Sequence, residues 1–288
     1  MKKEKITTLL LILLFLAGLS LLLYPAVSNY WNSYLQSKVI VNYDDNVSGM
    51  DDERYAELIA AAEDYNRRMA SGEIRYPENA EEYEQILDPF DTGVMGYIEI
   101  PVINCKLPIA HGTDDSVLRD SVGHLEWSGL PVGGESTHSV LSGHRGLPSA
   151  ELLTNIDRLE IGDRFYIHIL NTVLEYRVDE INVVEPNDSS KLQIVEGKDY
   201  VTLLTCTPYG INSHRLLVRG ERVADREDNS AAAPDLSDEV SPINTVYLLP
   251  VCLALLYVVF LIVYWTATRI GGVLRRKKHA AEQAEEEK

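Results

Sequence analysis

The sequence predicts a mainly β domain, a closed or nearly closed β-barrel with short helices, flanked by two membrane-spanning segments. Residues 93–223 contain short apolar runs interrupted by Pro and Gly, a spacing typical of barrels. The chain has 288 residues, 45% of them hydrophobic and 24% charged, which favours one globular core. Residues 6–24 and 246–267 carry no charge, and each stretch is long enough to cross ~30 Å of hydrocarbon as a helix.

Basic residues beside the two apolar stretches predict their orientation. Three lysines precede the first stretch, and five Lys or Arg residues follow the second. Such residues tend to stay in the cytoplasm, so both ends are expected inside and the middle outside the cell. The expected parts are a first segment at 1–28, a C-terminal transmembrane helix at 245–267 and a cytoplasmic tail at 268–288. Alternatively, the first segment is a signal peptide cleaved near Ala26-Val27-Ser28.

The formal net charge of −18 comes from the region between the two apolar stretches, because both ends of the chain are rich in basic residues. A surface of this sign repels phosphate backbones, which excludes nucleic acid as a partner. We interpret the charge as the solvated surface of an exported domain.

The region from 29 to 85 is expected to be helical and to precede the barrel. Residues 29–50 are polar and aromatic without a clear period. Within "DDERYAELIAAAEDYNRRMA", apolar residues recur at helical spacing after a possible N-cap at Asp51 or Asp52, which predicts a helix over 51–70.

The barrel itself is expected at 93–223, after a short segment at 86–92. Short helical turns are predicted at 115–120 and 150–156, and residues 224–244 are acidic and small, as in a flexible linker. The predicted strands are 96–103, 106–110, 139–142, 164–169, 172–184, 200–205 and 215–223.

Three cysteines are too few for a disulfide framework in an exported domain of this size. Cys252 lies in the second apolar stretch, which leaves Cys105 and Cys206 outside the membrane. Cys105 lies in the strand-like "VINCKLPIA" and is expected to be a small buried residue. Cys206 ends an apolar strand, where a loop begins.

The stretch "TLLTCTPYGINSHRLLVRG", residues 202–220, predicts a hairpin that brings a thiol to a cation. Pro208 and Gly210 form the turn, and a hairpin of these strands sets Cys206 opposite Arg215. A guanidinium there favours the thiolate and stabilises an oxyanion on a carbonyl that the sulfur attacks.

A thiolate nucleophile also needs a proton carrier. In "VLSGHRGLP", His144 follows an apolar run between two glycines that allow a tight turn, which makes it the best candidate. Its imidazolium would protonate a leaving amine, and its neutral form would deprotonate the incoming nucleophile. No His, Cys or carboxylate group has persuasive metal-ligand spacing, and no cofactor is expected.

These two stretches together resemble the signature of the sortases, particularly class C, the pilus-polymerising transpeptidases of Gram-positive bacteria. "LSGHRGLP" resembles the histidine motif and "TLLTCTPYGINSHRLLVRG" the cysteine motif, in the family's order. The resemblance covers roughly 86–223. It implies an eight-stranded sortase barrel with Cys206 as nucleophile, His144 as general acid and base, and Arg215 as stabiliser of substrate and oxyanion.

A further motif resembles the lid of class C enzymes. In "ILDPFDTG", Asp88-Pro89-Phe90 looks like a segment in which an acidic residue and an aromatic fold over the active site. We expect Asp88 to pair with Arg215 and Phe90 to cover Cys206 and exclude water. The alternative is a plain Asp-Pro turn with Phe90 in the core.

The resemblance implies a function at the cell membrane. Cys206 would cleave the Thr–Gly bond of an LPXTG-like sorting signal of a pilin through a thioester, and a lysine amine of another pilin would resolve it as an isopeptide. Three alternatives remain. The first is a wall-anchoring sortase, which would use a peptidoglycan amine. The second is a papain-like peptidase, in which the cysteine precedes the histidine in the sequence, whereas here His144 precedes Cys206. The third is a non-enzymatic receptor or adhesin, which would use Cys206 only for packing.

Overall fold

The computed structural model describes residues 2–223 and scattered positions between 253 and 272. Contacts divide the chain into two compact units, one of Met1–Val27 with Leu236–Lys288 and one of Ser28–Asp235. The predicted linker at 224–244, most of the second apolar stretch and most of the tail lie outside the described residues. The barrel and the candidate site residues belong to the second unit.

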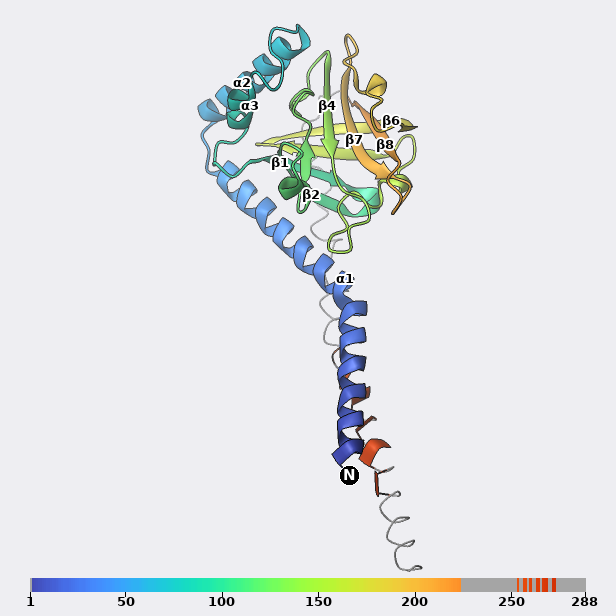
Figure 1. Cartoon of the computed structure of the whole chain (residues 1–288). Coiled ribbons are helices and arrows are strands. Elements are labelled where there is room, and N and C mark those ends of the chain that lie inside the picture. The colour runs from blue at the N-terminus through green and yellow to red at the C-terminus, as the bar shows by residue number, and fades with distance from the viewer. Residues whose placement is uncertain are drawn as a thin grey trace, which may run out of the picture. The chain divides into compact units, whose positions relative to one another are not determined.

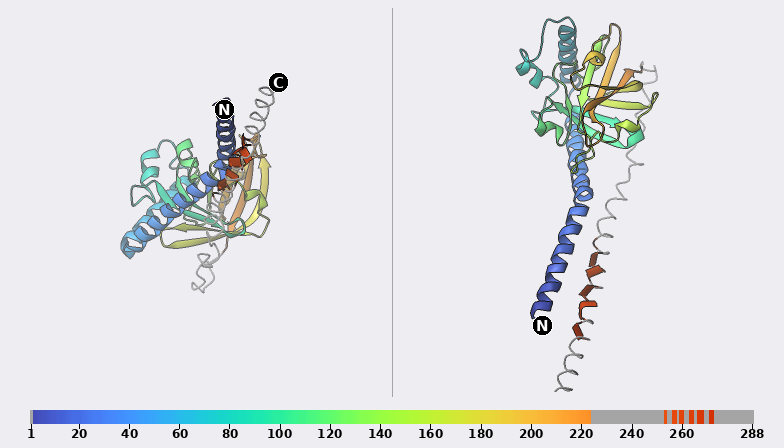
Figure 2. Two further views of the ribbon diagram at one scale, coloured as in Figure 1. Left: turned by 90° about the horizontal axis from the view of Figure 1, so that it is seen from below. Right: turned by 45° about the vertical axis from the view of Figure 1, so that its right-hand side comes forward.

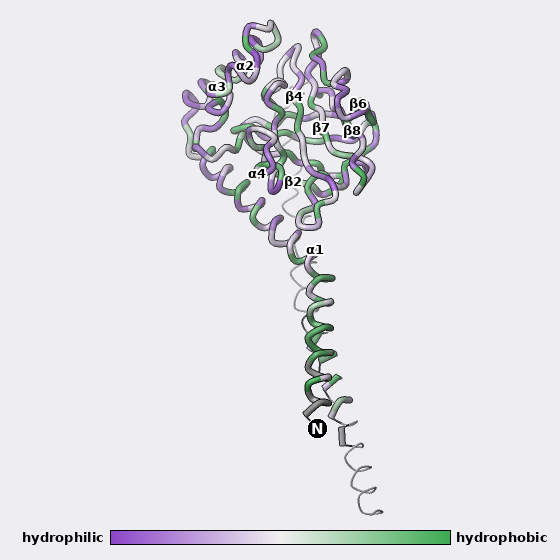
Figure 3. The backbone as a smooth tube through the Cα atoms, viewed as in Figure 1, coloured by the Kyte–Doolittle hydropathy of each residue, from purple (hydrophilic) through white to green (hydrophobic). Residues whose placement is uncertain are grey.

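The first apolar stretch is part of one long helix, α1 (Lys2–Ser48). Its N-terminal half is hydrophobic (Figure 3), and it is the one helix among the described residues that is long and apolar enough to cross a membrane. The helix continues to Ser48, so it includes most of residues 29–50, where the sequence shows no clear period. Ile40, Tyr43 and Val47 recur at helical spacing and are buried against the barrel core.

Two further helices precede the barrel and lie beside one another at its edge (Figure 1). The first, α2 (Asp52–Ala70), confirms the prediction, and the carboxylate of its N-cap Asp51 accepts a hydrogen bond of 2.7 Å from the Arg54 amide. The second, α3 (Ala80–Gln85), was not predicted, since a helix of six residues has too little period to recognise.

The predicted barrel is confirmed as a closed sheet with the order β1-β2-β3-β4-β7-β8-β6-β5 (Figures 1 and 2). Seven strands match predicted runs. The strand β3 was not predicted, and it has only three residues. The strands are β1 (Val94–Ile100), β2 (Cys105–His111), β3 (Val122–His124), β4 (Thr137–Ser142), β5 (Arg164–Ile169), β6 (Thr172–Val184), β7 (Asp199–Thr207) and β8 (His214–Arg222).

Short helical turns occupy the connections. The turn predicted at 115–120 is present as α4 (Asp115–Leu118). The helix predicted at 150–156 is wrong: residues 152–155 form turns, and only Ile156–Arg158 form a 3-10 helix, η2. The other 3-10 helices are η1 (Pro101–Ile103) and η3 (Ser190–Leu192).

The central strands of the site are β4, β7 and β8, which lie side by side (Figure 1). β4 pairs with β7 in parallel, from Thr137 opposite Asp199 to Ser142 opposite Leu204. β7 and β8 form an antiparallel hairpin. Side chains alternate along β7, so Leu203 packs in the barrel core while Leu204 joins a second, smaller apolar cluster on the other face.

A buried histidine at the end of β3 makes the stability of the fold depend on pH. The Nε2–H of His124 donates to the Gly129 carbonyl oxygen at 2.8 Å, and its Nδ1 accepts from the Tyr83 hydroxyl at 3.1 Å. Complete burial lowers the pKa of His124 to about 4. The folded state therefore holds this imidazole in its neutral form.

We expect acid to destabilise the fold through His124. The unfolded chain binds this proton near pH 6.5 and the folded chain only near pH 4, so stability falls as the pH drops between them. The fall between pH 7 and pH 4.5 should be roughly 2–3 kcal/mol. Urea unfolding at several pH values measures it. His124→Gln should flatten this dependence, and an equal fall in the variant would contradict the assignment.

Candidate active site

The hairpin of β7 and β8 brings the candidate thiol and cation together as predicted. Cys206 is directly opposite Arg215 in the ladder. Cys206 is a free, half-buried thiol, and Arg215 is also half-buried. The Arg215 Nη1 donates to the carbonyl oxygens of Asn212 at 3.4 Å and His214 at 3.2 Å, which holds the guanidinium at the turn end of the hairpin.

His144 reaches the same level from the other side of β7. The parallel ladder ends with Ser142 opposite Leu204, but its register continues. The Gly143 amide donates to the Leu204 carbonyl oxygen at 3.0 Å, and the Thr205 hydroxyl donates to the Gly143 carbonyl oxygen at 2.7 Å. One residue later, this register sets His144 beside Cys206, and neighbouring strands lie ~4.8 Å apart.

The three candidate residues therefore form a row in the order His144, Cys206, Arg215, with His144 in the loop directly after β4, Cys206 in β7 and Arg215 in β8. Alternation along the strands turns Cys206 and Arg215 to the face opposite the barrel core. The same face carries the smaller apolar cluster. This cluster was not predicted, because its members come from distant segments. They are Val140, Leu192 and Leu217, with Leu125, Val184 and Leu204 packed against them.

The loop that carries His144 is fixed by its backbone. The His144 carbonyl oxygen accepts from the Leu153 amide at 3.2 Å, and the Gly146 amide donates to the Thr154 hydroxyl at 3.1 Å. Gly146 has φ +79°, and a Cβ there would lie 2.9 Å from the Tyr209 ring. The glycine is required both for this backbone conformation and for the approach of the loop that follows Cys206.

Cys105 has none of these features. It begins β2, packs against the barrel core, and its Sγ lies 3.9 Å from the Leu152 carbonyl oxygen. Burial raises the pKa of its thiol to about 12, so the thiolate is scarce at neutral pH. Cys105 is thus a poor candidate for a nucleophile.

The segment Asp88-Pro89-Phe90 has other contacts than those expected. The Asp88 carboxylate accepts from the amides of Thr92 at 2.8 Å and Gly93 at 2.7 Å, and the Phe90 ring packs edge-on against Tyr43 at 6.3 Å. The expected Asp88–Arg215 pair is not among the ion pairs of residues 2–223, and the Phe90 ring packs against the barrel core. This geometry fits the alternative of a plain turn, because the Asp88 carboxylate caps amides of its own turn and the Phe90 ring packs against the nearby core.

Replacing both Asp88 and Phe90 by alanine is therefore expected to destabilise the fold, not to uncover the thiol. Loss of the cap and of the partly buried ring should cost on the order of 2 kcal/mol. Thermal unfolding measures this cost, and alkylation of Cys206 by iodoacetamide measures access to the thiol. The exposed Glu84→Ala is a matched control. Faster alkylation in a folded double variant would instead support the lid interpretation.

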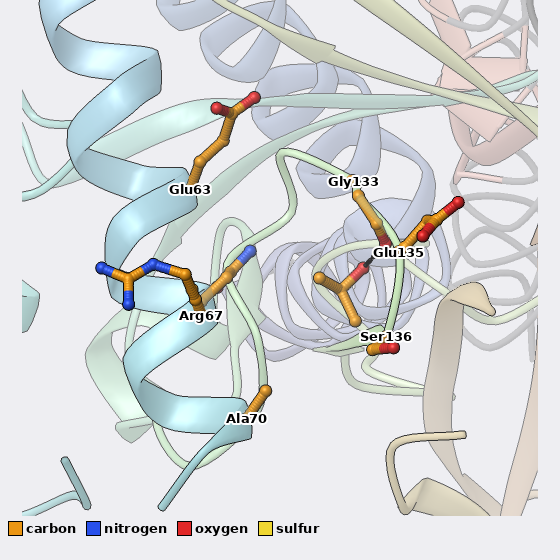
Figure 4. Close-up of a pocket in the computed structure, with 9 residues that line it drawn as sticks. Glu63, Arg67, Ala70, Gly133, Glu135 and Ser136 are labelled. Carbon is orange, nitrogen blue, oxygen red and sulfur yellow. Dashed lines mark hydrogen bonds between the residues drawn. The ribbon is translucent and has the colours of Figure 1, made fainter. Parts of the chain in front are cut away.

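A cavity of about 300 Å³ lies between α2 and the loop before β4 (Figure 4). Glu63 and Arg67 line it from the helix, and Gly133, Glu135 and Ser136 line it from the loop. It also touches Thr137, at the start of β4, whereas His144 follows the end of that strand. The cavity shares no lining residue with the row of three, so it is not the site of the candidate chemistry.

Comparisons with known proteins identify related proteins. The model of the Sortase domain family matches residues 98–223. Sortase D of Bacillus subtilis is 33% identical over 131 residues, which cover 44% of this chain and 63% of that protein. Sortase A of Bacillus anthracis is 28% identical over 226 residues, which cover 77% of this chain and 97% of that protein.

Solved structures give a closer match. Sortase C1 of Streptococcus agalactiae is 49% identical with a TM-score of 0.63, and the match covers 66% of this chain and all of that one. A Clostridium perfringens sortase C, solved with the C-terminal cell wall sorting motif, is 47% identical with a TM-score of 0.59, covering 65% of this chain and 98% of that one. The chain belongs to the sortase family of cysteine transpeptidases. Its structural neighbours are, more particularly, class C sortases.

Proposed function

We propose that this chain joins pilin subunits, using Cys206 as nucleophile, His144 as acid and base, and Arg215 as the stabiliser of the oxyanion. The observation that carries the proposal is the placement of Cys206 opposite Arg215 in the β7–β8 hairpin, with the His144 loop bonded to β7 through Gly143. The class C structures among its neighbours support the pilin substrate. The row supplies a thiol, a proton carrier and a cation, which an acyl transfer through a thioester requires.

In the first half of the reaction, the Cys206 thiolate attacks the threonine carbonyl carbon of the Thr–Gly bond in an LPXTG-like sorting signal. Arg215 donates hydrogen bonds to the oxygen on which negative charge develops. The carbon–nitrogen bond then breaks, its electron pair leaves with the glycine nitrogen, and the His144 imidazolium protonates that amine. A thioester with the pilin remains on Cys206.

In the second half, a lysine amine of another pilin attacks the thioester carbonyl carbon. The neutral His144 imidazole accepts the proton that this amine loses, and Cys206 leaves as the thiolate. The product is an isopeptide bond between the two subunits, and both catalytic groups return to their starting protonation states. Each added subunit repeats this cycle.

The smaller apolar cluster supplies a binding surface for the sorting signal. Leu204 is partly exposed on the outer face of the sheet, two residues from Cys206 along β7, and the buried Leu217 lies opposite it, two residues from Arg215 along β8. The leucine and proline of an LPXTG-like signal are apolar and lie just before the scissile bond. Burying them on this surface would hold the threonine carbonyl near the sulfur.

We propose that the barrel works on the outer face of the cell membrane. Helix α1 contains an apolar stretch that could anchor the chain. Lysines precede this stretch, and a basic cluster follows the second apolar stretch, which favours cytoplasmic ends. Protease treatment of intact cells should therefore digest the barrel and spare epitope tags at both ends. Protection of the barrel would contradict this orientation.

The reaction is tested with the full chain in detergent micelles. The substrates are a sorting-signal peptide, a pilin from the same genome and, in a parallel sample, a peptidoglycan stem peptide as the competing amine. Mass spectrometry should detect a thioester on Cys206 and then an isopeptide with the pilin lysine. His144→Ala should form neither product while remaining folded. A product with the stem peptide alone would overturn the pilin assignment in favour of wall anchoring.

A further inference from the structure

A buried cation follows His144 directly in the sequence. The Arg145 side chain is only 10% exposed, and its Nη2 pairs with the Asp157 carboxylate at 2.5 Å. Its Nη1 donates to the Thr207 hydroxyl at 3.2 Å. Removing a guanidinium from water is costly unless it is paired and hydrogen-bonded. The guanidinium of Arg145 is buried in spite of this desolvation cost, and Arg145 is the residue next to His144, the candidate base.

The partners of Arg145 connect the two segments that carry the candidate chemistry. Thr207 directly follows Cys206, and Arg145 directly follows His144. The hydrogen bond from Arg145 to Thr207 therefore lies one residue after both candidate residues. The contacts of Gly143 with Leu204 and Thr205 lie one residue before that pair. The two sets of bonds therefore hold the chain on both sides of His144.

Asp157 anchors the cation to a third element. It belongs to η2, which follows the turns at 152–155. Leu153 and Thr154, in those turns, donate or accept hydrogen bonds with the backbone of the His144 loop. The Arg145 guanidinium thus links the His144 loop both to the end of β7 and to η2. The planar fork of arginine can reach two partners in different directions, whereas an ammonium acts as a point charge.

We propose that Arg145 is a positioning residue for the transpeptidation, which sets the distance between His144 and Cys206 through its bonds to Asp157 and Thr207. The inference rests on the proposed function for its effect on turnover. It assigns Arg145 no contact with substrate. Proton transfer requires hydrogen-bond reach, and a displacement of about 1 Å in an active site can reduce the rate by ~10²-fold.

The experiment compares Arg145→Met, Arg145→Lys, Thr207→Val and Thr207→Ser in the full chain. Arg164→Met is the matched control, because Arg164 makes an ion pair of the same 2.5 Å length with Glu175 on the barrel surface. We expect Arg145→Met and Thr207→Val to reduce kcat by ~10–100-fold with little change in KM for the sorting-signal peptide. Thr207→Ser keeps the acceptor oxygen and should restore most of the rate, and Arg164→Met should resemble the wild type.

A second readout does not depend on turnover. The rate of Cys206 alkylation by iodoacetamide, followed against pH by peptide mass spectrometry, reports the coupling of thiol and imidazole. The profile of Arg145→Met should shift toward that of His144→Ala, while the fold remains intact by thermal unfolding. Loss of the pilin reaction in the wild type, with this shift present, would refute the proposed function and leave the positioning role supported.

Two results would overturn the inference. One is an Arg145→Met alkylation profile that coincides with that of the wild type. The other is equal kcat in Thr207→Val and Thr207→Ser, because the hydroxyl would then have no part in positioning. If Arg145→Met fails to fold, the Thr207 pair decides between these outcomes, since Thr207 contributes one neutral hydrogen bond and its loss should cost only ~1 kcal/mol in stability.

Discussion

Replacing Cys206 by alanine is expected to abolish both thioester formation and pilin joining, whereas Cys105→Ala should leave both nearly intact. Cys206 is half-buried on the outer face of the sheet, between the strands that carry His144 and Arg215. Alanine has no group that can form an acyl intermediate, so the remaining rate should be that of the uncatalysed reaction. Cys105 is buried against the core, where its pKa of about 12 keeps the thiol protonated.

Intact-protein mass spectrometry after incubation with a sorting-signal peptide measures the first effect. The wild type and Cys105→Ala should gain the mass of the acyl group, and Cys206→Ala should not. Gel analysis of pilin multimers measures the second effect. Retained joining by a folded Cys206→Ala protein would remove the thiol from the mechanism, and loss of joining in Cys105→Ala alone would assign the reaction to the other cysteine.

The Arg215→Lys substitution is expected to lower kcat/KM by ~10²–10³-fold, the loss typical of removing one oxyanion donor. Within the described residues, the hydrogen bonds of Arg215 to its own loop use only Nη1. Nη2 and Nε are left to bind substrate as two arms of a planar fork. An ammonium keeps the charge but cannot reproduce that geometry.

Steady-state kinetics with the sorting-signal peptide tests this expectation, with thermal unfolding to check the fold. Arg219→Lys is a matched control, because Arg219 lies four residues along the same strand and its guanidinium is engaged with Asp179 and Glu180. The control should lose stability without a comparable loss of kcat/KM. Near wild-type turnover in Arg215→Lys would show that charge alone suffices at this position.

The barrel could be predicted from the sequence to the extent that each strand shows its own pattern. Strands such as β6, with Thr172–Val184, are long runs bounded by turn residues, and they were recognised. β3 has three residues, too few for any period, and its place is set by pairing with β2 and β4. The second half of α1 lies in the region expected to be helical, but its few apolar residues, Ile40, Tyr43 and Val47, did not show that it packs on the barrel.

In the candidate site, too, the local arrangements could be predicted from the sequence and the long-range ones could not. Cys206 and Arg215 are joined by a hairpin, a local arrangement that turn residues reveal. His144 was chosen from its place between two glycines after an apolar run, but the parallel pairing of β4 with β7 joins distant strands and is contained in no local pattern. Asp88 was assigned to the wrong partner for a related reason: an Asp-Pro dipeptide fits a turn or a lid equally well until its surroundings are known.

The parallel pairing of β4 with β7 also governs when the chain becomes reactive. Thr137 pairs with Asp199 and Ser142 with Leu204, so this ladder closes a long loop, and such contacts form after local ones. The β7–β8 hairpin needs only its own turn, so Cys206 meets Arg215 early and His144 last. While the chain folds, the Cys206 thiol is therefore expected to be present before His144 reaches it. The onset of a Cys206 alkylation rate that depends on His144 should then mark the completion of the barrel.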